Sequence, residues 1–164
     1  MNSEKIIQIN IKPDTPGKHG LPKMSVSSAE IHYGGVDGDY NTYRQEKKKG
    51  EPDMAVMLIT QGILDDLNTE GWPVNNGDLG ENLTIQGLDY DCIEPEQTYR
   101  VGTALIQISF KCEPCIYLYS LPYIGDEHGQ EFMKTIKDRR GWYARVLEEG
   151  VVKEGDCFQL ENSL

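Results

Sequence analysis

The 164-residue sequence contains no long apolar segment. Its longest unbroken apolar run extends from Met54 to Ile59, six residues, whereas a membrane-spanning helix needs about twenty. The first five residues, Met1 to Lys5, also lack the apolar core of a secretory signal peptide. We therefore expect no membrane span and no export, and we expect a cytoplasmic location.

Positive charge is scarce. The chain has 16 Lys and Arg residues against 27 Asp and Glu, which gives a formal net charge of −11. The phosphate backbone of a nucleic acid would be repelled by such a surface, so nucleic-acid binding is not expected. A single phosphate group is still compatible with this charge, because a few local cations and backbone N–H groups suffice to bind it.

Histidine and cysteine are few, with three and four residues. Cys112 and Cys115 have C-x-x-C spacing, but a structural zinc site usually draws on a second pair, so no zinc is expected. Cys92 and Cys157 stand apart beside predicted strands, where we expect buried thiols. The C-x-x-C pair itself leaves alternatives open: two bystander thiols, a redox couple, or a reactive Cys115 in a loop after a strand.

Glycine and proline are plentiful, with 17 and 8 residues, which is typical of a turn-rich chain with short strands. Alternating apolar residues predict strands over 5–12, with Ile7, Ile9 and Ile11 on one face, and over 105–110, with Phe110 on the face of Ile106 and Ile108. Other strands are predicted at 26–33, 54–59, 83–86, 98–101, 144–147, 151–152 and 157–160, and helices after Thr60 and over 127–139. Residues 34–52 read as irregular. We expect a single mostly β, barrel-like domain over residues 1–164 with two helices attached.

Three polar segments are candidates for ligand binding. The two glycines in the segment from Gly77 to Asn82 would let the backbone approach an anion, although this segment alone favours a simple hairpin turn. Asp39 and Arg44 form either a ligand clamp or a surface ion pair. Arg145 lies between apolar neighbours on a predicted strand, so it is either a rim charge or a ligand contact.

Taken in order, these segments resemble the MOSC domain, named for the C-terminal domain of molybdenum cofactor sulfurase. The matching pieces are residues 20–23, 35–39, 55–59, 77–83, 114–115, 141–147 and 150–156. The resemblance covers residues 20–160 and is to the small stand-alone members. The chain has no room for an aminotransferase-like sulfurase domain or an iron–sulfur domain, so pyridoxal phosphate binding is not expected.

The resemblance implies a β barrel that holds a pterin-based molybdenum cofactor (molybdopterin with its metal). The characteristic cysteine of the family falls on Cys115, which would ligate molybdenum or carry sulfur as a persulfide. The cofactor carries a phosphate, so we expect a locally positive or neutral cleft beside Cys115. The residues expected to gather there and bind the cofactor are Lys23, Asp39, Arg44, Glu81, Asn82 and Arg145, with Arg139 and Arg140 as further candidates.

Several activities are consistent with this resemblance. Relatives include reductases of N-hydroxylated compounds, so a molybdenum-dependent oxidoreductase is one alternative and a sulfur carrier or transferase is another. Either would need an external electron or sulfur donor protein. Two further alternatives are a thiol redox protein that uses Cys112 and Cys115, and a non-catalytic interaction module on the same fold.

Overall fold

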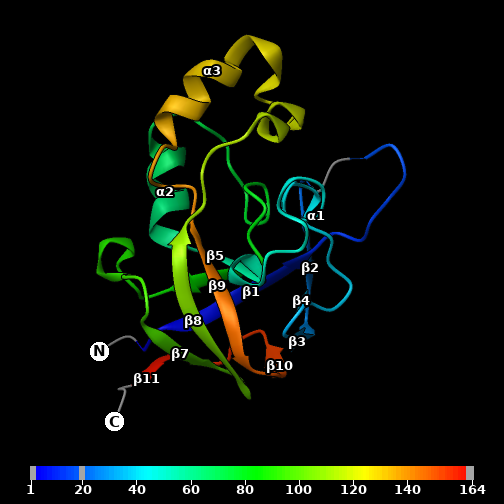
Figure 1. Ribbon diagram of the computed structural model, residues 1–164. Coiled ribbons are helices and arrows are strands. Elements are labelled where there is room, and N and C mark those ends of the chain that lie inside the picture. Colours follow the sequence, from blue (N-terminus) through cyan, green and yellow to red (C-terminus); the bar gives the residue numbers. More distant parts are fainter. Residues whose placement is uncertain (1–2, 19–20, 162–164) are drawn as a thin grey trace.

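The computed structural model describes residues 3–18 and 21–161, and within them most of the regular structure is strand. The strands are β1 (Lys5–Ile11), β2 (Met24–Val26), β3 (Ser28–His32), β4 (Gly35–Val36), β5 (Val56–Thr60), β6 (Leu83–Gln86), β7 (Thr98–Val101), β8 (Ala104–Lys111), β9 (Trp142–Glu148), β10 (Gly150–Lys153) and β11 (Phe158–Glu161). The helices are α1 (Thr42–Lys48), α2 (Gln61–Thr69) and α3 (Gly125–Thr135), with 3-10 turns η1 (Pro52–Met54), η2 (Tyr90–Cys92) and η3 (Ile116–Ser120). The mostly β class is confirmed. Figure 1 shows α3 at one end of the molecule and β3, β10 and β11 at the other.

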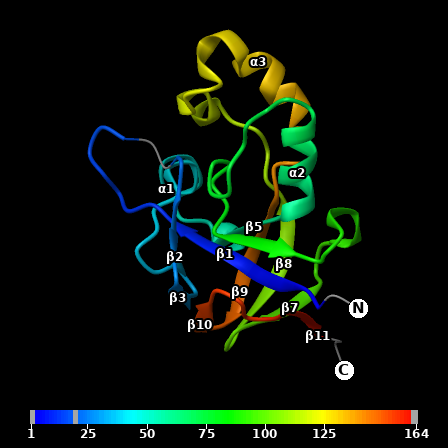
Figure 2. The ribbon, with the colours of Figure 1, turned by 180° about the vertical axis from the view of Figure 1, so that it is seen from behind.

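The larger sheet has the strand order β11-β7-β8-β9-β5-β6-β1-β2, and the smaller one the order β10-β3-β4. The β5–β6 pair is parallel because α2 carries the chain back across the sheet between these strands, whereas the neighbouring pairs are antiparallel. Among the described residues no ladder joins the end strands β11 and β2, so the curled sheet does not close into a barrel. A bridge between Lys5 and Cys157 brings the start of β1 beside β11 (Figure 2).

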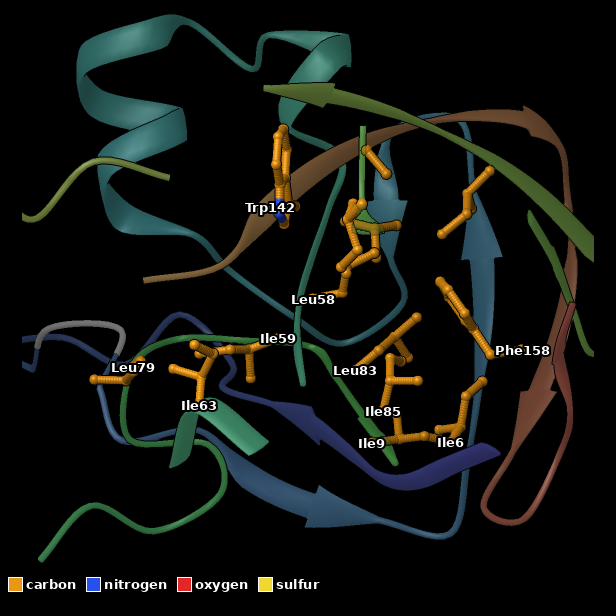
Figure 3. Packing of buried hydrophobic residues seen from close by; sticks show 14 of the residues in the cluster. Ile6, Ile9, Leu58, Ile59, Ile63, Leu79, Leu83, Ile85, Trp142 and Phe158 are labelled. Carbon is orange, nitrogen blue, oxygen red and sulfur yellow. The ribbon is translucent and has the colours of Figure 1, made fainter. Parts of the chain in front are cut away.

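The core lies inside this curled sheet. All five residues of β5 are buried, as the continuous apolar run predicts for a strand covered on both faces. Figure 3 shows Leu58 of β5 near Leu83 of β6, with Phe158 and Ile6 farther along the same interior. The strands near the site are therefore held by dense apolar packing.

Two β-bulges overturn the alternation predicted from the sequence. In β1 the register shifts between Ile6 and Gln8, so Ile6 and Ile9 are fully buried while Ile7 is only partly so. In β8 the shift falls between Ile108 and Lys111, and it turns Phe110 outward to 43% exposure. An extra residue in one strand moves the side chains that follow it to the opposite face of the sheet. An alternating apolar pattern in the sequence does not reveal such an insertion.

The helices agree with the sequence in part. The helix after Thr60 and the one over 127–139 are present as α2 and α3, although the Thr60 side chain makes no capping bond. The stretch predicted to be irregular contains α1 instead, whose Arg44 N–H donates to the Asn41 side chain. No helix in the described ranges is both long and apolar enough to cross a bilayer.

Candidate functional site

A small pocket, open to solvent, lies beside Cys115. It is formed where the loop before β2, the start of α1, β5, the loop before β6 and the start of β9 converge on the segment before η3. The described residues that line it are Leu21, Lys23, Asn41, Thr42, Tyr43, Met57, Gly80, Cys115, Tyr117, Arg140 and Tyr143. Lys23 and Arg140 are the formally charged residues in that described lining, so both charges that face the pocket are positive in a chain of net charge −11.

Arg140 holds the sulfur atom of Cys115. One guanidinium nitrogen, Nη1, lies 3.0 Å from Cys115 Sγ and donates at 2.8 Å to the carbonyl of Glu113. Nε and Nη2 donate to the carbonyl of Leu79 at 3.2 and 3.1 Å. Burial opposes the charged form of Arg140, but the neighbouring sulfur atoms of Cys112 and Cys115 outweigh it, and the pKa of the guanidinium lies above its ordinary value. A fixed cation therefore faces the partly exposed thiol.

Cys112 occupies a different environment. Its side chain is 2% exposed and packs with Met54, Met57 and Tyr143, and its sulfur lies 3.3 Å from the Tyr143 hydroxyl. Burial raises the pKa of the Cys112 thiol, which favours the uncharged form. All four cysteines are free thiols, so the C-x-x-C pair is not bridged in this structure. Contrary to the expectation of buried thiols, Cys92 and Cys157 are exposed.

Lys23 forms a buried ion pair behind the pocket. Its Nζ lies 2.6 Å from Asp39 Oδ2, and both side chains are less than a tenth exposed. The same oxygen accepts a hydrogen bond from Asn82 Nδ2 at 2.9 Å, and Asp39 Oδ1 accepts from the backbone N–H of Lys12 at 2.8 Å. Asp39 therefore fixes Lys23 at the pocket wall while its own oxygens remain satisfied.

Asp39, Asn82 and Arg44 line a neighbouring cavity, which shares Asn41 with the Cys115 pocket. The Arg44 guanidinium donates to three backbone carbonyls, those of Gly34, Gly50 and Glu51. Burial lowers its pKa from the ordinary value, and the nearby carboxylates of Glu51 and Asp39 oppose that shift. In this structure Arg44 thus ties α1 to its flanking loops.

Arg145 lies apart from the Cys115 pocket, which departs from the expected single cleft. Its Nε donates to Asp53 Oδ1 at 2.7 Å and its Nη1 donates to Gln107 Oε1 at 2.7 Å. These partners lie on η1 and β8, whereas Cys115 precedes η3. Alternation along β9 places Arg145 on the same face as Tyr143, two residues farther along the strand, and its contacts with Asp53 and Gln107 hold it outside the pocket lining.

Glu81 is completely buried and lines neither cavity. One carboxylate oxygen accepts the backbone N–H of Gly77, and the other has no hydrogen-bond partner among the described residues. Burial raises the pKa of Glu81 to about 7. The carboxylate thus orders the loop that presents the carbonyl of Leu79 to Arg140.

Gly20, part of the segment at residues 20–23, lies outside the described residues.

Glycine is required twice in this loop. At Gly77, where φ is +95°, an added Cβ would overlap the carbonyl of Lys23. At Gly80, where φ is +94°, an added Cβ would lie 3.0 Å from a Leu21 methyl carbon and 3.8 Å from the Arg140 guanidinium. The two glycines bring the backbone against Lys23 and leave space at the pocket wall.

Comparison with known proteins identifies the family. The family model for the MOSC domain matches residues 45–159. The chain belongs to the MOSC domain family. An uncharacterized Bacillus subtilis protein, YflK, is 31% identical over 90 residues, which are 54% of this MOSC domain chain and 38% of YflK. The chain thus spans well under two thirds of that relative.

Solved structures share the fold. The crystal structure of YiiM from Geobacillus stearothermophilus is similar with a TM-score of 0.73 and 27% identity, over 97% of this chain and 75% of that one. YiiM from Escherichia coli has a TM-score of 0.66 and 23% identity, over 98% and 71% of the two chains. The YUAD protein from Bacillus subtilis has a TM-score of 0.77 at 17% identity, over 99% and 98%. The curled sheet with its three helices is therefore a MOSC fold.

The buried carboxyl group of this MOSC domain makes stability depend on pH. The pKa of Glu81 is about 7 in the folded chain against an ordinary value of 4.5, so between these pH values the folded chain holds a proton that the unfolded chain has lost. The free energy of unfolding should therefore fall by about 3 kcal/mol as pH rises from about 4.5 to about 7. Glu81→Gln, which keeps an acceptor for Gly77, should remove this slope in urea unfolding measured at several pH values.

The exposed Glu127 provides the control, since Glu127→Gln should retain the wild-type slope. A Glu81→Gln protein with an unchanged slope would assign the pH dependence to other groups.

Several residues that line the pocket are not predicted from the sequence, or are predicted only as secondary candidates. Arg140 was expected only as a further candidate, beside Arg139, whose guanidinium binds Glu70 on the surface. Tyr43 and Asn41 lie in the stretch predicted to be irregular, and no pattern marks them. Tyr143 falls within a segment that carries the family resemblance, so resemblance was the available signal for it.

Proposed function

We propose that this MOSC domain binds a pterin-based molybdenum cofactor in the Cys115 pocket, with Cys115 as the protein's sulfur ligand or as the carrier of a sulfane sulfur. The observation that carries the proposal is the contact between Arg140 Nη1 and Cys115 Sγ at 3.0 Å, inside a pocket whose charged described lining residues are both cations. Membership of the MOSC domain family supports the choice of cofactor.

The donor chemistry of the pocket fits this group. A thiolate is a soft ligand, suited to a metal that already has sulfur donors on an organic cofactor, and such a metal needs only one ligand from the protein. Arg140 donates one hydrogen bond to that sulfur and places a positive charge beside it, which stabilises a thiolate. The buried Cys112 is unsuited to the same role because its pKa is raised and its sulfur faces Tyr143.

The phosphate of the cofactor would lie toward Lys23. The ammonium group is held at the wall by Asp39, and the Asn41 and Thr42 side chains beside it add uncharged donors. Asp39, Asn82 and Glu81 then act as positioning residues for Lys23 and for the loop that bears Leu79. The guanidinium groups of Arg44 and Arg145 are bound to other groups and stabilise the surrounding structure.

When bound, the cofactor supplies two-electron redox chemistry at the metal. The protein's own contribution is to bind and orient it, to hold the Cys115 sulfur against Arg140, and to cover one side with Met57 and Tyr143. A reductase of this kind would receive its electrons from a partner protein, as the family resemblance implies. The same sulfur could instead accept sulfane sulfur from a donor protein.

The charge of the pocket provides a direct test. Titration of the chain with molybdopterin and with its dephosphorylated form should show the phosphorylated form binding about tenfold more tightly at low salt, and the difference should narrow as salt is added. The reason is that Lys23 and Arg140 attract the phosphate, whereas the pterin is common to both forms. Equal affinities at low salt would contradict the proposed placement of the phosphate.

A further inference from the structure

A separate cavity, open to solvent, lies between the end of α2 and α3 and shares no described lining residue with the Cys115 pocket. Figure 1 shows α3 above the C-terminal end of α2, away from β3, β10 and β11. Three aromatic side chains, Trp72, Tyr123 and His128, and two carboxylates, Glu70 and Glu131, line this cavity. Cofactor binding as proposed leaves it without a role.

The aromatic walls of this cavity are fixed in place. The Trp72 ring packs on the fully buried Phe132, with ring centroids 4.9 Å apart. The Tyr123 hydroxyl donates a hydrogen bond to Asp78 Oδ2 at 2.8 Å. Trp72 and Tyr123 are only partly buried against the core, so part of each side chain remains exposed. Walls held in this way bind a ligand at little cost in ordering.

The His128 ring stands nearly perpendicular to the Trp72 ring. The two planes meet at 79°, and the ring centroids are 6.4 Å apart. His128 lies on α3 and Trp72 follows α2, so the corner between the two rings joins both helices. The face of an aromatic ring carries partial negative charge and attracts cations, most strongly for Trp. The arrangement of the rings therefore suits a cation.

The charges at the cavity favour a cation as well. Both oxygens of Glu70 are bound by the Arg139 guanidinium, at 2.7 and 2.9 Å, so this pair contributes no net charge. The Glu131 carboxylate has no hydrogen bond or ion pair within residues 3–18 and 21–161. Lys134, one turn farther along α3, forms no ion pair with it. Glu127 adds a further carboxylate, 4.0 Å from the His128 ring.

The side chains of the lining offer few free hydrogen-bond acceptors. The Glu70 oxygens are used by Arg139, and the Tyr123 hydroxyl directs its proton to Asp78. A primary ammonium such as that of lysine carries three N–H donors, which lose their water when they enter a cavity. A trimethylated ammonium has no N–H and needs only the ring faces and a nearby negative charge. The lining therefore favours an alkylated ammonium group.

We infer that this cavity binds a small organic cation that carries an alkylated ammonium group. The rings of Trp72, Tyr123 and His128 contact its methyl groups, and Glu131 supplies the opposite charge. The inference is independent of the proposed cofactor function, because the two sites share no described lining residue.

The test uses choline as the probe, with 3,3-dimethylbutan-1-ol as its neutral counterpart, in which carbon replaces the charged nitrogen. Ligand-observed NMR with the whole chain at pH 8 should show saturable choline binding, about tenfold tighter than binding of the alcohol. Trp72→Leu should weaken choline binding about tenfold, because the strongest cation-binding ring is lost while an apolar side chain remains.

A pair of charge variants separates a local contact from general charge. Glu131→Gln should weaken choline binding about threefold at low salt, and less as salt is added. Asp126→Asn removes the same charge from an exposed residue of α3 outside the lining, and it should leave the affinity nearly unchanged. Equal losses in the two variants would contradict a contact with Glu131.

No saturable binding of choline would overturn the inference, and so would equal affinity for the alcohol or for Trp72→Leu. Urea unfolding checks that Trp72→Leu still folds, and if it does not, the two probes and the charge variants decide. Cys115→Ser should bind choline as the wild type does. A loss of choline binding in Cys115→Ser would assign the cation to the cofactor pocket and overturn the inference.

Discussion

Cys115→Ser should abolish molybdenum retention and sulfur loading, whereas Cys112→Ser should retain most of both. Serine keeps the size of the side chain but its hydroxyl is far less acidic than a thiol and is a hard ligand. Only Cys115 combines partial exposure, a place in the pocket and a guanidinium contact. Molybdenum would be measured by elemental analysis, and bound sulfane sulfur by cyanolysis.

The controls separate chemistry from folding. Cys112→Ser places a hydroxyl in an apolar cluster and should cost about 1–2 kcal/mol of stability, with the Tyr143 partner still in reach. Cys92→Ser, at an exposed thiol, should change neither stability nor loading. Loss of loading in Cys112→Ser but not in Cys115→Ser would reverse the assignment. Equal losses in both, with disulfide formation tracking activity, would favour the redox-pair hypothesis.

Arg140→Lys should destabilise the chain by about 3 kcal/mol and lower cofactor retention severalfold. Arg140 is 6% exposed, and its guanidinium reaches the carbonyls of Leu79 and Glu113 together with the Cys115 sulfur. A lysine keeps the charge, but its single ammonium cannot reproduce the planar fork, so buried carbonyls lose their donors. Urea unfolding gives the change in stability, and titration with molybdopterin gives the affinity.

The neighbouring Arg139 offers a matched control. It binds Glu70 at the surface and the carbonyl of Thr135 at the end of α3, so Arg139→Lys should leave loading unchanged and alter stability little. If the two variants lost the same amount of stability and affinity, the contact with Cys115 would have no special role. Stability lost without any change in loading would make Arg140 a purely structural residue.

Much of the fold was predictable because its strands are short and apolar. The strands at 83–86 and 98–101 agree with β6 and β7 residue for residue, and the run at 54–59 falls on η1 and β5. The bulges in β1 and β8 were not predictable, because one inserted residue reverses the faces without changing composition. Helix α1 was missed because it is held by the Asn41 cap and by Arg44 rather than by an apolar stripe.

The candidate site was predictable where a motif fixes the backbone. Lys23 and Cys115 meet in one pocket, and Asp39 and Asn82 hold Lys23 from behind. Arg145 lies outside the pocket, which the sequence did not predict. Alternation predicts which face of a strand a side chain occupies, but it does not predict which other elements cover that face. The sequence does not distinguish Arg140 from Arg139, although the first contacts Cys115 and the second binds Glu70 at the surface.

The central claim is that the Cys115 pocket holds a molybdenum cofactor. The most direct measurement is the molybdenum and pterin content of the wild-type chain after gentle purification from a host that makes the cofactor. The account predicts that molybdenum and a fluorescent oxidised pterin both elute with the protein, in matching amounts, and that both are absent from Cys115→Ser prepared in parallel. Wild-type protein that carries neither, under conditions where a known molybdenum enzyme from the same host is loaded, would contradict it.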